Sequence, residues 1–508
     1  MNSAKKNFAY HPLLISLAPI ISFYDHNKDI VSFQYLIRPL LISFSLSVLV
    51  FVLLNIIIKN HKKSAIIVSI YIVSFFLYSF YSEIFKFVDP LVDYDSLSLV
   101  IGLFFWLAIL FLVAKSQQNF GSITKYLNIF SLIIIIIPTA SLAYYNYQTS
   151  KSANLPSLAL VEGNNEVNKP DIYYIILDGY GRQDVLKEIY NYDNSEFINW
   201  LENKGFFVAE KSSANYTQTY LSMTASLNLN YLDKMQALDP KSKDRKWLRD
   251  KLKNNYVYDF LKEKNYTFVS LPSTWTGNYK NIKADLEIKN NFKNNDFEDL
   301  LLEATPLSIF LDPEKKVLNY KEKMIFIFDE LGKISQMDEN TFVYAHLLMP
   351  HPPFIFSYNG NLKYEKNCIK GLDGNHYYQN CPGMEKYRQS YVEQLQYTNK
   401  KTMETIEYIL KNSDKEPIII LQADHGAGSM LDWESLEKTN LKERFSILNA
   451  YYTPEETKNS LSDDITPVNS FRIIFNSVFG TNFEILENKN YFSTWNKPYE
   501  LIDITNKL

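Results

Sequence analysis

The sequence has little net charge, very few cysteines and no internal repeat. Its formal net charge is −4 over 508 residues, so charge gives no support for a nucleic-acid partner. The lack of a repeat or low-complexity tract excludes a repeat array. No small-residue cleavage site follows the first apolar stretch near the N-terminus, so we do not interpret this stretch as a removed signal peptide.

Long apolar stretches are confined to the first 150 residues. They lie at Pro12–Tyr24, Leu36–Ile58, Ser64–Phe85, Leu97–Ala114 and Tyr126–Tyr145. A helix that crosses a bilayer needs about 20 apolar residues, and all of these stretches except the first meet that length. We nevertheless count the first, because the lysine pattern between the stretches alternates only if it crosses. Residues 1–150 are therefore predicted to form a bundle of five transmembrane helices.

Lysines between the apolar stretches predict the orientation of the chain. They occur before the first stretch, between the second and third, and between the fourth and fifth, as Lys5, Lys6, Lys59, Lys62, Lys63, Lys115 and Lys125. Lysine-rich loops stay in the cytoplasm. Five crossings then place the remainder of the chain outside. We predict a multi-pass protein of the cytoplasmic membrane, with the lipid bilayer as a partner and an extracytoplasmic C-terminal domain.

The two cysteines, Cys368 and Cys381, lie in a polar segment of this C-terminal part. Outside the cytoplasm such a pair is predicted to form a disulfide that closes a small loop. Two free thiols are the alternative. A zinc site is less favoured, because His376 is the only histidine between the two cysteines.

The C-terminal part is predicted to be an α/β domain. Residues 151–169 are polar, contain proline and glycine, and are interpreted as a linker to a domain at 170–508. Three short apolar runs predict buried parallel strands: IYYIIL (172–177), FVYAHLLM (342–349) and PIIILQA (417–423).

Helical patterns separate these predicted strands. They cover Asp244–Lys264, Pro313–Ile334 and Tyr387–Leu410. Strands that alternate with helices predict one sheet with helices on both faces. Asn295–Ala304 and Lys366–Gly383 are predicted to be surface insertions.

Candidate metal ligands follow the three predicted strands. Asp178 comes directly after the first strand, His351 soon after the second, and Asp424 and His425 directly after the third. The carboxyl ends of parallel strands meet at one edge of a sheet, so these side chains are predicted to converge. A carboxylate with an imidazole suits Zn²⁺ or Mn²⁺ better than Ca²⁺. Taken alone, each string also fits an ordinary turn or an exposed loop histidine.

A hydroxyl nucleophile is predicted in TQTYLSMTAS (217–226). A threonine at a helix N-terminus faces backbone N–H groups that favour an anionic phosphoryl group, although a plain N-cap has the same pattern. We favour Thr219, with Thr217 as the alternative. Asn215 is a candidate donor to a phosphoryl oxygen. Arg182 is a candidate bidentate phosphate ligand, and a surface ion pair is its alternative role.

With these motifs in this order, the chain resembles the alkaline phosphatase/sulfatase superfamily. More narrowly, it resembles membrane-anchored sulfatase-like transferases, such as lipoteichoic acid synthase and the phosphoethanolamine transferases. The motifs cover residues 170 to about 480, and the arrangement of apolar stretches extends the resemblance to the whole chain. The resemblance implies an alkaline-phosphatase-like α/β sandwich domain after the five-helix bundle.

The resemblance also implies a role for each candidate residue. Asp178 would be the acidic metal ligand at the end of the first strand. Thr219 would be the nucleophile and would touch the same metal ion. Asp424 and His425 would supply two further ligands, and His351 would bind the transferred group.

Two departures from the family pattern limit the substrate. The arylsulfatase signature, a Cys or Ser followed by x-Pro-x-Arg, is absent, and threonine cannot become formylglycine, so hydrolysis of sulfate esters is disfavoured. Asn399 stands where two-metal members commonly carry an aspartate. We therefore predict one divalent ion, Zn²⁺ or Mn²⁺, with Mg²⁺ and Ca²⁺ as alternatives.

These observations predict a metal-dependent transferase. A phosphate-ester head group would move from a membrane phospholipid onto Thr219 and then onto a glycan or lipid acceptor of the cell envelope. A phosphodiesterase, phosphatase or other sulfatase-like hydrolase would use the same residues. A third hypothesis is a catalytically inactive protein of envelope assembly.

Overall fold

The computed structural model describes residues 8–28, 31, 33–80, 94–152, 169–271, 283–288, 296–369, 371–379, 381 and 383–508. The chain divides into two compact units, one of residues 1–155 with 292–316 and one of residues 156–291 with 317–508. Most of the predicted linker, residues 153–168, lies outside the described residues.

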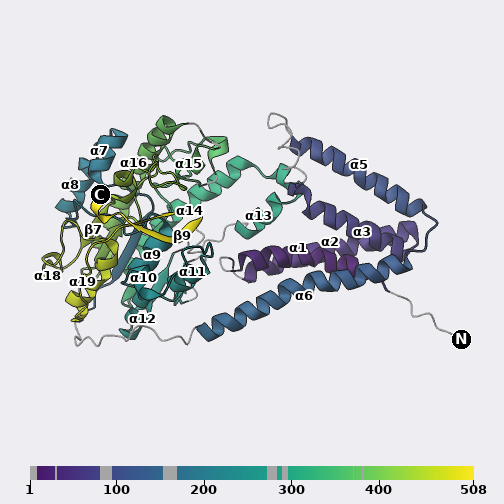
Figure 1. Ribbon diagram of the computed structural model, residues 1–508, viewed down its shortest axis with the longest axis horizontal. Helices are drawn as coiled ribbons and strands as arrows, with labels where there is room; N and C mark the ends of the chain where they lie inside the picture. Colours follow the sequence, from purple (N-terminus) through teal and green to yellow (C-terminus); the bar gives the residue numbers. More distant parts are fainter. Residues whose placement is uncertain are drawn as a thin grey trace. The chain divides into compact units, whose positions relative to one another are not determined.

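The first unit is helical. Its described elements are α1 (His11–Asn27), α2 (Gln34–Ile58), α3 (His61–Phe76), α5 (Tyr94–Lys115), α6 (Gly121–Ser152), α13 (Asp296–Glu303) and the 3₁₀ helix η2 (Pro306–Phe310) (Figure 1). Within the part of the chain that is described, Gln34–Ile58 and Gly121–Tyr147 are long and apolar enough to cross a membrane, and Leu99–Lys115 is a shorter apolar helix.

The predicted bundle of five transmembrane helices is not confirmed by these lengths. Helix α1 has 17 residues and α3 has 16. At about 1.5 Å per residue each is roughly 25 Å long, less than the hydrocarbon core of about 30 Å. The last part of the predicted third stretch, residues 81–85, lies outside the described residues.

The prediction of a surface insertion at Asn295–Ala304 is corrected by α13. Phe297 of this helix is 2% exposed and packs with Ile20, Tyr24 and Leu36 of the first unit. Burial of the aromatic ring against α1 and α2 explains why this short segment belongs to the helical unit although it lies late in the sequence.

The second unit is built on a mixed seven-stranded sheet of order β2-β7-β6-β1-β5-β3-β4. Its strands are β1 (Ile172–Leu177), β2 (Phe207–Val208), β3 (Thr267–Ser270), β4 (Leu286–Glu287), β5 (Thr341–Leu347), β6 (Ile418–Gln422) and β7 (Asn449–Tyr452). Strand β1 is parallel to both β5 and β6, which confirms the three predicted parallel strands. Strands β8 (Tyr491–Thr494) and β9 (Lys497–Asp503) form a separate antiparallel pair.

Both faces of this sheet are covered by helices. Alternate β1 residues face opposite ways. Tyr173 and Ile175 lie in one core with residues of α7 (Gln183–Tyr190), α8 (Ser195–Asn203), α14 (Pro313–Lys333) and α16 (Met384–Asn412). Tyr174 and Ile176 lie in another with residues of α9 (Thr219–Leu227), α12 (Tyr256–Glu263) and α19 (Pro467–Phe479). Figure 1 shows α7 and α16 on one side of the sheet and α12 and α19 on the other. The unit is therefore a three-layer α/β/α sandwich, as predicted.

The helices of this unit follow the predicted patterns with one interruption. They are α7 (Gln183–Tyr190), α8 (Ser195–Asn203), α9 (Thr219–Leu227), α10 (Leu232–Met235), α11 (Lys246–Lys253), α12 (Tyr256–Glu263), α14 (Pro313–Lys333), α15 (Gly374–Tyr377), α16 (Met384–Asn412), α17 (Leu441–Phe445), α18 (Glu455–Lys458) and α19 (Pro467–Phe479). The pattern predicted as one helix over Asp244–Lys264 forms α11 and α12. The break occurs because Asn255 caps α12, its side chain accepting a hydrogen bond from the Tyr258 N–H.

Candidate metal centre

Three buried side chains meet at the carboxyl edge of the central strands. Asp178 follows β1, and Asp424 and His425 follow β6, its parallel neighbour. Each offers one ligand atom, and these atoms all lie within 4.8 Å of one another. The strand order therefore brings together residues that are far apart in the sequence.

The tautomer of His425 shows that this cluster suits a cation. Its Nδ1 lies 3.0 Å from the carbonyl oxygen of Gly426, which only accepts hydrogen bonds, so Nδ1 carries the proton. In the neutral ring the Nε2 lone pair then faces carboxylate oxygens of Asp424 at 3.2 Å and Asp178 at 3.6 Å. A lone pair directed at two carboxylates is repelled unless a positive ion lies among them.

Two carboxylate oxygens in the cluster support the same conclusion. Asp178 Oδ1 and Asp424 Oδ2 are buried and have no hydrogen-bond partner. A buried acceptor without a partner costs free energy, and a divalent ion removes that cost. The donor set of two carboxylates and one imidazole nitrogen is typical of Zn²⁺ and Mn²⁺ sites.

The ionisation of the cluster matches a metal-ligating state. Burial lowers the pKa of His425, and the nearby charge of Arg444 lowers it further, so the ring stays neutral. Burial alone would raise the pKa of Asp178. The charge of His351 and a hydrogen bond from His346 outweigh burial and hold that pKa below its usual range.

Thr219 lies at the edge of the cluster. It is the first residue of α9, and its hydroxyl oxygen lies 3.1 Å from His425 Nε2. The alternative, Thr217, has a buried hydroxyl that accepts a hydrogen bond from the Ser493 N–H at 3.1 Å. Thr217 therefore attaches the segment before α9 to strand β8, whereas the Thr219 hydroxyl faces the predicted ligands.

His351 lies in a loop that is fixed by contacts at both ends of the residue. Its backbone N–H donates to the Asp178 carbonyl oxygen at 3.1 Å, and its own carbonyl oxygen accepts from the Gln394 side chain at 2.9 Å. The ring centroid lies 6.1 Å from that of His425. His351 is therefore held beside the cluster, outside the group of closely spaced ligand atoms.

Asn215 and Arg182 are not brought into the cluster. The Asn215 amide donates to the Lys489 carbonyl oxygen at 2.9 Å and accepts from the Val468 N–H at 3.0 Å. Arg182 forms a bidentate pair with Asp184, at 2.8 and 3.0 Å. The side chain of Asn215 thus connects backbone segments, and Arg182 makes the ion pair that was its alternative role.

Three residues near the cluster were not identified from the sequence. His346 on β5 lies 3.1 Å from Asp178 Oδ2, Asp373 lies 3.7 Å from His351 Nε2, and Arg444 pairs with Asp373 at 2.8 Å. His346 is a buried histidine inside an apolar strand, a pattern that could have identified it. Asp373 and Arg444 lie in polar segments with no comparable pattern.

Asp373 also corrects the prediction that Lys366–Gly383 is a surface insertion. The structure joins Cys368 and Cys381 in a disulfide, and the segment between them carries Asp373, which is 5% exposed. Burial raises the pKa of Asp373, but the charges of His351 and Arg444 and a hydrogen bond from Tyr387 lower it by more. The segment therefore places a carboxylate beside the cluster.

Comparison with known proteins identifies the family. The Sulfatase family model matches residues 170–470, which include every residue of the cluster. The chain therefore belongs to the sulfatase family and is an enzyme of that family, as its resemblance to the alkaline phosphatase/sulfatase superfamily predicted. No curated protein sequence matches the chain.

Solved structures similar to this chain include phosphoethanolamine transferases. The zinc complex of the C-terminal periplasmic domain of EcEptC from Escherichia coli has a TM-score of 0.45 and 12% identity, covering 69% of this chain and 97% of that one. The integral membrane protein lipooligosaccharide phosphoethanolamine transferase A from Neisseria meningitidis has a TM-score of 0.39 and 12% identity, covering 92% of this chain and 94% of that one. Such low identities describe a likeness of fold alone.

Proposed function

We propose that this protein is a metal-dependent transferase that moves a phosphate-ester head group from a membrane phospholipid to an envelope glycan or lipid, with Thr219 as the nucleophile. The main support is the position of His425 Nε2, which lies 3.1 Å from the Thr219 hydroxyl and 3.2 Å from an Asp424 carboxylate oxygen. A hydroxyl at the edge of a cation site, on the first residue of a helix, is suited to attack a phosphoryl group.

The reaction has two displacement steps. In the first, the Thr219 hydroxyl oxygen attacks the donor phosphorus and loses its proton, and the bond from phosphorus to the diacylglycerol oxygen breaks. Diacylglycerol leaves with a proton, and the head group stays on Thr219 as a phosphodiester. In the second, an acceptor hydroxyl attacks phosphorus, the bond to Thr219 breaks, and Thr219 regains a proton.

Asp178, Asp424 and His425 would hold one divalent ion, Zn²⁺ or Mn²⁺. When bound, the ion would lower the pKa of the Thr219 hydroxyl and neutralise charge on the phosphoryl group. The N–H groups of the first turn of α9 point toward the same anionic group. His351, held beside the cluster, donates a hydrogen bond to a phosphoryl oxygen.

A membrane location supports a lipid donor. Helices α2 and α6 include segments long and apolar enough to cross a bilayer, and the lysines alternate between the predicted stretches. We propose that residues 1–150 cross the cytoplasmic membrane five times and that the sulfatase domain lies outside. A donor in the outer leaflet would then meet the nucleophile at a high effective concentration.

Turnover of a fluorescent phospholipid tests this function. The full-length protein, loaded with Mn²⁺ or Zn²⁺, is mixed with vesicles that contain phosphatidylethanolamine or phosphatidylglycerol labelled on the acyl chain. We expect release of labelled diacylglycerol by the wild type and none by the Thr219→Ala variant. Release that is unchanged in the variant would contradict a covalent role for Thr219, and hydrolysis without an acceptor product would indicate a phosphodiesterase.

A further inference from the structure

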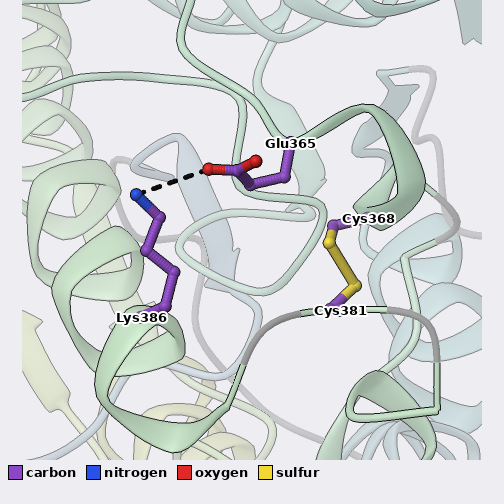
Figure 2. The surroundings of a disulfide bond; sticks show 4 residues. All are labelled: Glu365, Cys368, Cys381 and Lys386. Atoms are coloured by element: carbon purple, nitrogen blue, oxygen red, sulfur yellow. Dashed lines mark ion pairs between the residues drawn. A yellow bond between two sulfur atoms is a disulfide. The ribbon is translucent and has the colours of Figure 1, made fainter.

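The segment closed by the Cys368–Cys381 disulfide carries Asp373 to the side of His351. Figure 2 shows this disulfide beside the ion pair of Glu365 with Lys386 of α16, whose charged atoms are 3.4 Å apart. The Nε1 atom of Trp433 also donates to the Asp373 carbonyl oxygen at 3.0 Å. The disulfide at the ends of the segment, the ion pair beside it and the hydrogen bond to its backbone thus restrain the position of Asp373.

The carboxylate of Asp373 is held by two donors and is buried. The Tyr387 hydroxyl donates to Oδ1 at 2.5 Å, and Arg444 Nη1 donates to Oδ2 at 2.8 Å. Position 428 is glycine, and a Cβ there would overlap the Asp373 carboxylate. Both oxygens therefore have protein partners, and the absence of a side chain at position 428 leaves room for the carboxylate.

The geometry of His351 indicates what this carboxylate does. His351 Nδ1 lies 2.6 Å from the Pro352 carbonyl oxygen, an acceptor, so Nδ1 carries a proton. Nε2 lies 3.7 Å from Asp373 Oδ2, which is too long for a hydrogen bond. The negative charge thus lies close to the Nε2 edge of the ring and leaves that nitrogen available to another group.

We propose that Asp373 is a positioning residue that prepares His351 to bind the transferred phosphoryl group. Because Nδ1 already carries a proton, Nε2 can donate to a phosphoryl oxygen only when it is protonated as well, and the nearby negative charge of Asp373 stabilises that cationic ring. Tyr387 and Arg444 hold the carboxylate in place and so prevent it from occupying Nε2. The proposal rests on the proposed phosphoryl transfer, because His351 has this role only with a phosphoryl oxygen as its partner.

The plainer alternative is that Asp373 only neutralises the buried Arg444. A double-mutant cycle separates the two roles, because residues that act together show non-additive effects. The cycle uses Asp373→Asn, His351→Gln and the double variant in full-length Thr219→Ala protein loaded with Mn²⁺. The measured quantity is the affinity for inorganic phosphate, by titration calorimetry.

With His351 present, we expect Asp373→Asn to weaken phosphate binding about tenfold. With His351 replaced by Gln, we expect the same substitution to weaken it less than about twofold. A difference of this size is ordinary for neighbouring groups that act together. Equal losses in the two backgrounds would overturn the proposal, and so would a His351→Gln variant that binds phosphate as tightly as its parent. The affinity for phosphate is measured without a lipid donor. Coupling between Asp373 and His351 in that affinity, together with no turnover of phospholipid by the wild type, would therefore refute the proposed function alone. Turnover without coupling would refute the role of Asp373 alone.

A second pair of variants covers the case in which Asp373→Asn does not fold. Tyr387→Phe removes one hydroxyl that holds the carboxylate and leaves the Asp373–Arg444 pair. The matched control is Tyr378→Phe, in the segment closed by the disulfide, whose hydroxyl donates to the Ser429 carbonyl oxygen at 2.7 Å. We expect Tyr387→Phe to weaken phosphate binding only when His351 is present, and Tyr378→Phe to leave it unchanged. Equal effects of the two substitutions would contradict the proposal.

Discussion

The hydroxyl oxygen of Thr219 lies 3.1 Å from Nε2 of His425, although the two residues are 206 positions apart. One begins helix α9 and the other follows strand β6. The contact puts the proposed nucleophile at the nitrogen that the Gly426 carbonyl leaves free for a metal ion. The predictions below follow from this contact and from the groups around it.

Replacement of the nucleophile is expected to stop turnover while leaving the fold intact. Thr219→Ala removes one hydroxyl from a half-buried position, and we expect kcat to fall about a thousandfold or more. Thr217→Ala is the matched control. It removes the acceptor of the Ser493 N–H, which is expected to cost about 1 kcal/mol of stability and to change kcat little. The reverse pattern in steady-state assays would make Thr217 the nucleophile.

Metal binding is expected to stabilise the folded protein through Asp424. A ligand that binds only the folded state at 100 times its Kd adds about 2.7 kcal/mol. We expect Mn²⁺ or Zn²⁺ to raise the Tm of the wild type and to leave that of Asp424→Asn unchanged. Asp184→Asn, which changes a carboxylate paired with Arg182, serves as the control. We expect Mn²⁺ or Zn²⁺ to raise the Tm of this variant as it raises that of the wild type. A metal-induced shift of normal size in Asp424→Asn would argue against this site.

His346 is expected to tune metal affinity through Asp178. Its Nε2 lies 3.1 Å from Asp178 Oδ2, so it restrains a proposed ligand without being one. Groups that hold metal ligands typically change affinity by about 10- to 100-fold when replaced. We therefore expect His346→Gln to weaken Mn²⁺ binding by about that factor in a competition titration with a chelating dye. An unchanged affinity would show that Asp178 needs no such restraint.

Glu443 is expected to make stability depend on pH. Burial raises its pKa above the ordinary value of 4.5, and the charge of Asp373 acts in the same direction. Between 4.5 and the raised pKa the folded state holds a proton that the unfolded state has lost, so stability falls as pH rises, by at most about 1.4 kcal/mol per pH unit.

The Glu443→Gln variant provides the reference for that effect, because its side chain has no charge to bury. Melting temperatures of both proteins, measured in detergent from acid to neutral pH, should show the wild type losing stability relative to the variant as the pH rises above 4.5. A difference that stays constant with pH would contradict the assignment.

The proposed topology predicts which residues are accessible from outside the cell. Both native cysteines are in the disulfide, so an introduced cysteine can be labelled alone. We expect Tyr358→Cys, in the sulfatase domain, to react with a membrane-impermeant maleimide on intact cells. Gln118→Cys, between α5 and α6, should react only after permeabilisation. Labelling of Gln118→Cys on intact cells would contradict five crossings from a cytoplasmic N-terminus.

Local patterns in the sequence predicted the core of the fold. The apolar runs of β1, β5 and β6 are short, rich in β-branched residues and bounded by turns, which is typical of buried parallel strands. Because parallel strands end at a common edge, the same runs predicted that Asp178, Asp424 and His425 would lie close together. Their proximity depends on strand order more than on the details of side-chain packing.

The remaining features depend on tertiary contacts that a local pattern does not contain. Phe297 lies in a polar stretch and is buried by α1 and α2. Asp373 reaches the cluster because Arg444 and Tyr387 compensate the cost of burying its charge. Asn215 is a residue type that can donate a hydrogen bond to a phosphoryl oxygen, but its amide is hydrogen-bonded to backbone groups. Composition and spacing predict which residues are suited to a site, and packing decides which of them reach it.

The central claim is that Thr219 carries the transferred group. Intact-mass spectrometry of the full-length protein, after incubation with Mn²⁺ and mixed bacterial phospholipids, tests it most directly. We expect a mass increase equal to one phosphate-ester head group in the wild type and none in Thr219→Ala, with fragment spectra that place the addition on Thr219. An adduct on another residue, or turnover of phospholipid with no adduct under rapid acid quench, would contradict the account.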